Sequence, residues 1–176
     1  MGLRLLPPSL INRIAAGEVL ERPASAVKEL VENSLDAGAD KIDVILTDGG
    51  KESLIVIDNG KGMTPDELSL AVERHATSKL PTDDLFHLDF LGFRGEALPS
   101  VGSVARMTIT SRPAGSESAW SLSVNGGEKG EPEPSSAGFG TRIEVRDMFY
   151  AVPARLKFLK SAATEISAVK DILDRL

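Results

Sequence analysis

One helix-forming stretch, residues 24–39, constrains the fold of this chain more than any other segment. On a helix, Glu29, Asn33 and Asp36 fall at i, i+4 and i+7, so they form one narrow polar stripe. Apolar residues occupy the other side, which is the side expected to be buried: Val27, Leu30, Val31 and Leu35. The stripe carries two acids and an amide without a cation, which fits either a solvated helix face or a binding site.

Composition indicates one ordinary soluble domain and excludes several chemistries. Of the 176 residues, 41% are hydrophobic and 26% are charged, and no apolar run approaches the length of a membrane span. The absence of cysteine excludes disulfides and thiolate ligands and fits a cytoplasmic protein. With two histidines and no HExxH pattern, a zinc hydrolase is not indicated. The net charge of −6 argues against gripping nucleic acid over the whole surface, although a local basic patch remains open.

Five β-like runs predict strands, and the continuously apolar residues 54–57 indicate that one of them is central and buried. Residues 41–47 and 52–57 are joined by Asp48-Gly49-Gly50, which favours a hairpin. Three further alternating runs lie later in the chain, at residues 105–111, 119–124 and 141–146. The segment 128–136 is rich in Glu, Pro and Ser and is predicted to be an exposed, mobile loop.

Capping residues predict further helices. Ser9 is expected to cap a helix over residues 10–16 that Gly17 ends, and its apolar stripe is expected to pack on the domain or on a second copy. Thr64, followed by Pro65 and Glu67, predicts a helix reaching about Arg74. The remaining predictions are a long loop up to residue 95, a short helix ending near residue 102, and a helix from residue 164 without a stop signal. The missing stop signal suggests a piece of a longer protein.

Glycine-bearing segments are the candidate ligand-binding features. They are Asp58-x-Gly60-x-Gly62, residues 92–98 and residues 138–141, and each alone fits a simple turn equally well. Glycines just before a short helix let free N–H groups face a phosphate, and Arg94 and Lys79 could add charge-assisted contacts. Neither GxxxxGK[ST] nor GxGxxG occurs.

Asp58 follows a buried strand, where a carboxylate is costly unless a donor meets it. It is therefore either a turn or cap residue, or an acceptor for an exocyclic amine such as the N6 group of adenine.

Together these segments resemble the four motifs of the GHKL ATPases, a superfamily of gyrase-type topoisomerases, ninety-kilodalton heat-shock chaperones, histidine kinases and MutL proteins. The resemblance is closest to the MutL family and covers nearly the whole chain. Five segments carry it in the right order: residues 12–23, 32–38, 74–79, 92–98 and 152–159.

The resemblance implies a role for each matching residue. Glu29 matches the general base that activates a water for attack on the γ-phosphate of ATP, and Asn33 matches the Mg²⁺ ligand. Asp58 matches the carboxylate that reads adenine. Gly62 and Thr141 are implied to line the base pocket, and Gly60 and Met63 are implied to bind the nucleotide. Those implied to wrap the phosphates are Thr77, Ser78, Lys79, Gly92, Phe93, Arg94, Gly95, Glu96, Ala97 and Leu98. Asp36 either supports the site or is solvated, and Arg155 and Lys157 either form a basic surface for DNA or the other subunit or are solvated charges.

The fold implied is α+β, a two-layer sandwich of a mixed, mainly antiparallel sheet with helices on one face. Residues 1–176 would be one GHKL-type ATP-binding domain, without the second domain and C-terminal dimerisation region of the longer protein. In this superfamily a lysine of the second domain reaches the γ-phosphate, so hydrolysis by the 176 residues is expected to be weak or absent.

The implied function is a nucleotide-driven dimerisation switch in DNA mismatch repair. The implied partners are a second MutL-like subunit, the mismatch-recognition protein MutS and, weakly, DNA, with no membrane. Two alternatives stay open. One is another GHKL ATPase of chaperone or topoisomerase type, and the other is a non-catalytic interaction scaffold that retains the fold.

Overall fold

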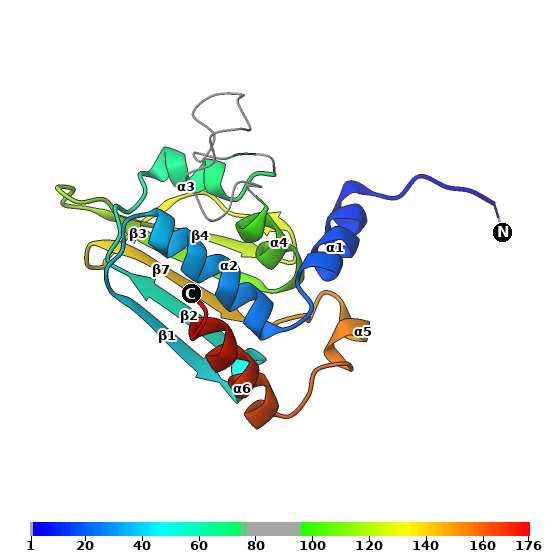
Figure 1. The fold of residues 1–176 in the computed structure, drawn as a ribbon. Coiled ribbons are helices and arrows are strands. Elements are labelled where there is room, and N and C mark those ends of the chain that lie inside the picture. Colours follow the sequence, from blue (N-terminus) through cyan, green and yellow to red (C-terminus); the bar gives the residue numbers. More distant parts are fainter. Residues whose placement is uncertain (1, 75, 77–95) are drawn as a thin grey trace, which may run out of the picture.

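The computed structural model describes residues 2–74, 76 and 96–176, which form two layers (Figure 1). One layer is a sheet in the order β1-β2-β7-β3-β4-β5, with β6 paired to β4, and every recorded strand pair in the described residues is antiparallel. The strands are β1 (Ile42–Thr47), β2 (Ser53–Asp58), β3 (Arg106–Arg112), β4 (Ala119–Asn125), β5 (Glu128–Lys129), β6 (Glu133–Ser135) and β7 (Gly140–Arg146). The expected α+β class is confirmed.

Helices α2, α4 and α6 cover one face of the sheet, as expected (Figure 1). The described helices are α1 (Pro8–Val19), α2 (Pro23–Asp36), α3 (Pro65–Ala71), α4 (Ala97–Val104), α5 (Pro153–Leu156) and α6 (Ala162–Leu173). The core lies between the layers, where Val27 and Leu30 of α2 meet Leu54 and Val56 of β2. Leu35 was expected on the buried side, but it is 37% exposed because it lies at the end of α2, beyond the edge of this core.

The sheet register brings three strand ends together. The β1–β2 hairpin turns through Asp48–Gly50, as predicted, and returns the chain along β2, which lies between β1 and β7. Thr141 on β7 is the register partner of Asp58 on β2 and of Ser111 on β3. A carboxylate and two hydroxyl side chains from distant parts of the sequence therefore meet at one end of three neighbouring strands in the middle of the sheet.

The prediction for the first helix was wrong at both ends. The helix begins at Pro8, a residue favoured at the first helical position, so Ser9 does not cap it. Gly17 lies inside the helix, because packing of α1 on α4 outweighs the roughly 1 kcal/mol that glycine costs in a helix. Arg155 also donates to the Gly17 carbonyl oxygen at 2.6 Å, which holds this turn in place.

Two other predictions need correction. Helix α3 has the predicted capping box but ends at Ala71, because Arg74 leaves the helix to pair with Glu96. The segment predicted as a loop over residues 128–136 contains β5 and β6, two short strands that are exposed, as expected, but pair with β4. None of the helices described is both long enough and apolar enough to span a membrane.

Candidate functional site

Asp58 ends β2 as a buried carboxylate that is only 8% exposed. Ser34 of α2 donates its hydroxyl to Oδ2 at 2.7 Å, while the backbone N–H groups of Gly60 and Thr141 donate to Oδ1 at 2.9 and 3.3 Å. These donors offset the cost of burying the charge. Each oxygen accepts about two hydrogen bonds, so Oδ2 keeps one acceptor position for a further group.

Two glycines let backbone segments pack closely, one against Asp58 and one against Arg112 at the end of β3. Gly140 has φ +103°, and a Cβ added there would collide with the carbonyl oxygen of Asp58. Gly62 has φ +70°, and a Cβ there would collide with the carbonyl oxygen of Arg112. Both positions therefore require glycine for two separate reasons, backbone conformation and space. Of the predicted glycines, Gly60 and Gly140 thus lie against Asp58, and Gly62 lies against the end of β3.

Ser111 joins the residues on the other side of Thr141 and is fully buried. Its Oγ accepts from the backbone N–H of Met63 at 2.8 Å, lies 2.8 Å from Thr141 Oγ1, and is 3.1 Å from the carbonyl oxygen of Gly140. Neither Ser34 nor Ser111 was predicted from the sequence. Ser34 lies one residue after Asn33, and Ser111 stands out only once the pairing of β3 with β7 is known.

Glu29, Asn33 and Asp36 lie on one partly exposed stripe of α2, as the helical spacing predicted. The nearby cation, Lys28, pairs instead with the buried Glu32 at 3.0 Å, and its hydrogen bond to Glu32 raises the pKa of Lys28. The negative charge of Glu29, on the stripe itself, also contributes to the raised pKa of Lys28. In the described part of the chain, no three His, Cys, Asp or Glu side chains gather as a metal site.

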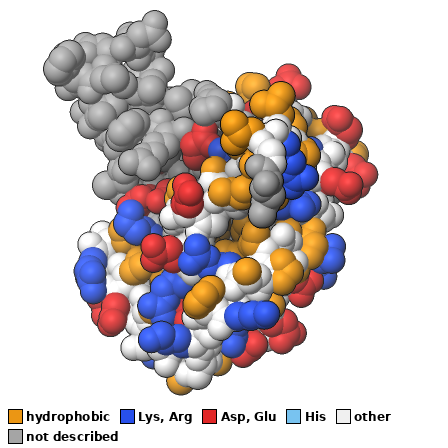
Figure 2. Space-filling model, turned by 90° about the vertical axis from the view of Figure 1, so that its right-hand side faces the viewer, with side chains coloured by type: hydrophobic (Ala, Val, Ile, Leu, Met, Phe, Trp, Pro, Cys, Tyr) orange, Lys and Arg blue, Asp and Glu red, His pale blue; other side chains and the backbone are white. Residues whose placement is uncertain are grey.

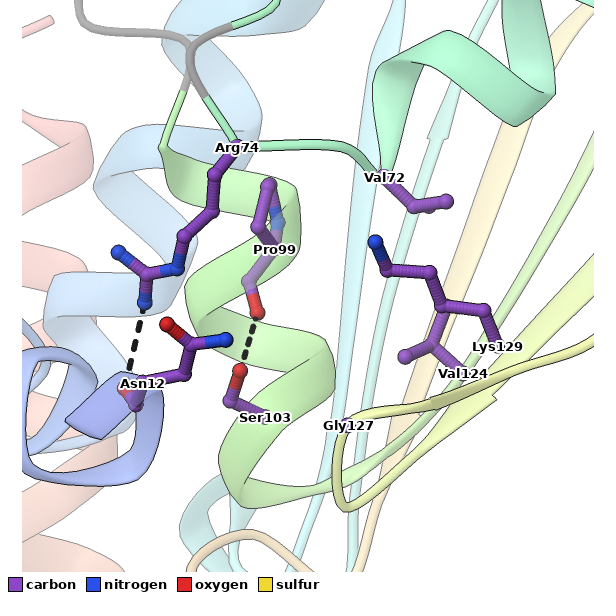
Figure 3. A pocket seen from close by; sticks show the side chains of 8 residues that line it. All are labelled: Asn12, Val72, Arg74, Pro99, Ser103, Val124, Gly127 and Lys129. Atoms are coloured by element: carbon purple, nitrogen blue, oxygen red, sulfur yellow. Dashed lines mark hydrogen bonds between the residues drawn. The ribbon is translucent and has the colours of Figure 1, made fainter. Parts of the chain in front are cut away.

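The start of α4 is held by Arg74. Its guanidinium donates to Glu96 Oε2 at 2.8 Å and to the carbonyl oxygen of Asn12 in α1 at 3.2 Å, and Glu96 is the N-cap residue of α4. Figure 3 shows Arg74 reaching toward Asn12 beside Pro99 and Ser103 of α4. These residues line a cavity of about 30 Å³, which is room for about one water.

The other predicted phosphate-contacting residues divide into two groups. Ala97 and Leu98 are the first residues of α4 and are partly buried. Seven others lie outside the described residues: Thr77, Ser78, Lys79, Gly92, Phe93, Arg94 and Gly95.

Arg22 and Glu165 form a bidentate ion pair, with two contacts of 3.1 Å, at the start of α2. Glu165 is 1% exposed and also accepts from the backbone N–H of Lys160 at 3.1 Å. Burial alone would raise the pKa of Glu165, but the Arg22 and Lys160 hydrogen bonds outweigh it, and the net pKa is lowered. This ion pair therefore links α6 to the N-terminal end of α2, the helix that carries Glu29.

The face that carries α1 and α5 mixes hydrophobic, basic and acidic side chains (Figure 2). Ile11 and Ile14 of the predicted apolar stripe are 49% and 47% exposed, so the stripe does not pack fully on this domain. Phe158, after α5, is also exposed. Of the two predicted basic residues, Arg155 bonds to α1 and Lys157 is exposed.

Known proteins similar to this chain agree with the fold. Residues 21–139 match the family of histidine kinase-, DNA gyrase B- and HSP90-like ATPases. The DNA mismatch repair protein MutL of Paramagnetospirillum magneticum is 68% identical over all 176 residues, and so is MutL of Rhodospirillum rubrum. The chain spans 29% and 28% of the lengths of these two relatives.

Solved structures show the same likeness. The Aquifex aeolicus MutL ATPase domain complexed with ADP is 33% identical, with a TM-score of 0.72 over 88% of this chain and 54% of that one. The N-terminal domain of a DNA repair protein is 31% identical, with a TM-score of 0.76 over 93% of this chain and 47% of that one. The chain therefore belongs to the family of histidine kinase-, DNA gyrase B- and HSP90-like ATPases, within the branch formed by the ATPase domains of MutL proteins.

Proposed function

We propose that this chain binds ATP with Mg²⁺ and is the ATP-hydrolysing module of a MutL-like mismatch repair protein. One observation carries the proposal: Asp58 is a buried carboxylate whose surroundings leave an acceptor position on Oδ2. An exocyclic amine such as adenine N6 donates to such a group. Gly60, Gly62, Met63 and Thr141 then border the base. The ADP complex of the 33% identical relative supports this assignment.

The partly exposed stripe of α2 suits the phosphate end of the nucleotide. Asn33 offers a neutral oxygen to Mg²⁺, an ion that takes most of its six ligands from waters and phosphate oxygens, so one protein ligand suffices. When bound, the ion neutralises phosphate charge during hydrolysis. Glu29, one turn earlier, is placed to accept the proton of the attacking water. Asp36, further along the same stripe, supports the site and takes no part in the chemistry.

The phosphate-wrapping residues complete the proposal. Glu96, Ala97 and Leu98 stand at the start of α4, where helix N–H groups and the helix dipole favour an anion. Thr77, Ser78, Lys79 and the segment from Gly92 to Gly95 would contact the phosphates from outside the described residues. In this proposal residues 1–176 form the ATP-binding domain, and hydrolysis by them alone is weak or absent because a lysine from a second domain is needed.

The proposed biological role is a switch in the longer protein. Nucleotide binding favours association of two such subunits, and the exposed Ile11 and Ile14 give α1 an apolar surface for that contact. The proposed partners are the second subunit, MutS and, weakly, DNA. The whole-chain likeness to MutL proteins supports these roles over those of a chaperone, a topoisomerase or a scaffold.

Calorimetric titration of the chain with ADP and Mg²⁺ tests the proposal. The parent chain is expected to bind, and Asp58→Ala is expected to lose roughly 100-fold or more in affinity, because a paired charged acceptor is removed. Asp43→Ala is the matched control, since Asp43 lies on β1 with a half-exposed carboxylate. Absence of binding by the parent, or equal binding by the Asp58 variant, would overturn the proposal.

A further inference from the structure

Thr141 lies beside Asp58 and so shares its side of the proposed base pocket. Its backbone N–H donates to Asp58 Oδ1 at 3.3 Å, and its register on β7 places it directly opposite Asp58. The side-chain hydroxyl of Thr141 can turn its proton in different directions, and the direction decides whether it presents a donor or an acceptor. A group that fixes this direction therefore also fixes what the pocket recognises.

Ser111 is the group in contact with that hydroxyl. It is fully buried, and Ser111 Oγ lies 2.8 Å from Thr141 Oγ1. The same Oγ accepts from the N–H of Met63 and lies 3.1 Å from the carbonyl oxygen of Gly140. A serine hydroxyl has one proton to donate and two positions to accept.

Counting donors and acceptors favours one arrangement of these protons. If Ser111 donates to Thr141, the carbonyl oxygen of Gly140 receives no proton from Ser111. If Thr141 donates to Ser111 and Ser111 donates to Gly140, all three contacts of Ser111 become hydrogen bonds. Buried polar groups are overwhelmingly paired, so the second arrangement is favoured. Thr141 then presents only lone pairs to its surroundings.

We infer that Ser111 is a positioning residue that locks the Thr141 hydroxyl as an acceptor beside Asp58, and thereby makes the pocket select a 6-amino purine over a 6-oxo purine. This inference rests on the proposed nucleotide site. Two neighbouring acceptors suit an exocyclic amine, which carries only N–H groups, and they repel a carbonyl oxygen. Without Ser111, the Thr141 hydroxyl is free to turn and donate to that carbonyl oxygen.

The test compares ADP with inosine diphosphate, which has the same sugar and phosphates but a 6-oxo group. The measured quantity is the ratio of the two Kd values, because a general loss of stability changes both constants alike. For Ser111→Ala, the preference for ADP is expected to fall by roughly tenfold, the scale of one altered hydrogen bond. Ser103→Ala is the control, since Ser103 is a buried serine that bonds to Pro99 within α4.

A double-variant comparison shows whether Ser111 acts through Thr141. Adding Ser111→Ala to Thr141→Val should leave the ratio of Kd values unchanged, because no hydroxyl remains to be oriented. Thr141→Ser keeps the hydroxyl and should keep the preference for ADP.

An unchanged ratio in Ser111→Ala, with ADP binding still dependent on Asp58, would overturn this inference and leave the proposed function standing. A further change on adding Ser111→Ala to Thr141→Val would overturn it too. If the parent chain binds neither nucleotide, the proposed function itself fails, and the inference fails with it.

Discussion

The two functional regions of α2 are built differently. Near its end, Ser34 and Asp58 belong to a closed set of hydrogen bonds supplied by α2, β2 and β7. In its middle, Glu29 and Asn33 lie on a partly exposed stripe, and the neighbouring Lys28 pairs with Glu32. In the proposed function, base recognition therefore rests on the hydrogen-bonded set around Asp58, whereas the phosphate chemistry rests on the more exposed stripe of α2.

The largest effect is expected from breaking the closed region at Gly140. Gly140→Ala forces a side chain into a positive φ and against the carbonyl oxygen of Asp58. Backbone strain together with overpacking should cost at least about 3 kcal/mol of unfolding free energy, measured by urea denaturation. Gly138→Ala is the control, because no atom lies within 4 Å of its added Cβ. Equal stabilities of the two variants would show that the region around Asp58 is not closely packed.

A smaller effect is expected from loosening the start of α2. Glu165→Gln removes the charge that pairs with Arg22, and the expected loss is about 2 kcal/mol of unfolding free energy, because Glu165 is buried but Arg22 is partly exposed. Glu73→Gln, in the exposed pair with Lys129, should cost under about 0.5 kcal/mol. If Glu165→Gln also lost under about 0.5 kcal/mol of unfolding free energy, the Arg22–Glu165 pair would not link α6 to α2.

The Glu165 pair also predicts a pH dependence. The folded-state pKa of Glu165 is lowered below its ordinary value of 4.5, so its contribution is fully present above about pH 4.5 and is lost as the pH falls through the folded pKa. Urea denaturation at several pH values should therefore show a steeper acid loss of stability for the parent than for Glu165→Gln. Parallel curves would contradict the prediction.

The smallest effect is expected at the link between α1 and α4. Arg74→Ala removes the contacts to Glu96 and to the carbonyl oxygen of Asn12, at a cost of about 1 kcal/mol. Amide hydrogen exchange in α1 should speed up, while exchange around Asp58 stays slow. Lys129→Ala, which breaks only an exposed ion pair, is the control. Unchanged exchange in α1 would show that Arg74 does not hold this helix.

The sequence predicted the periodic parts of this molecule well. The stripe of Glu29 and Asn33, the capping box at Thr64 and the β1–β2 hairpin follow from local spacing and were found as expected. Ser111 could not be predicted, because its importance arises from the pairing of β3 with β7, which joins residues distant in the sequence. The C-terminal end of α1 was missed because tertiary packing on α4 outweighs the local preference of Gly17, and its start was missed because Pro8 begins the helix in place of a Ser9 cap.

One titration tests the difference between the two regions most directly. Asp58→Asn and Glu29→Gln make the same carboxylate-to-amide change, and ADP with Mg²⁺ is titrated into both variants and the parent. We expect Glu29→Gln to bind ADP with a Kd within about threefold of that of the parent. Asp58→Asn should lose roughly 100-fold or more in affinity, because its amide N–H₂ group would face the hydrogen-bond donors that surround Asp58. Equal losses, or a larger loss at Glu29, would contradict the assignment of base recognition to the closed region around Asp58.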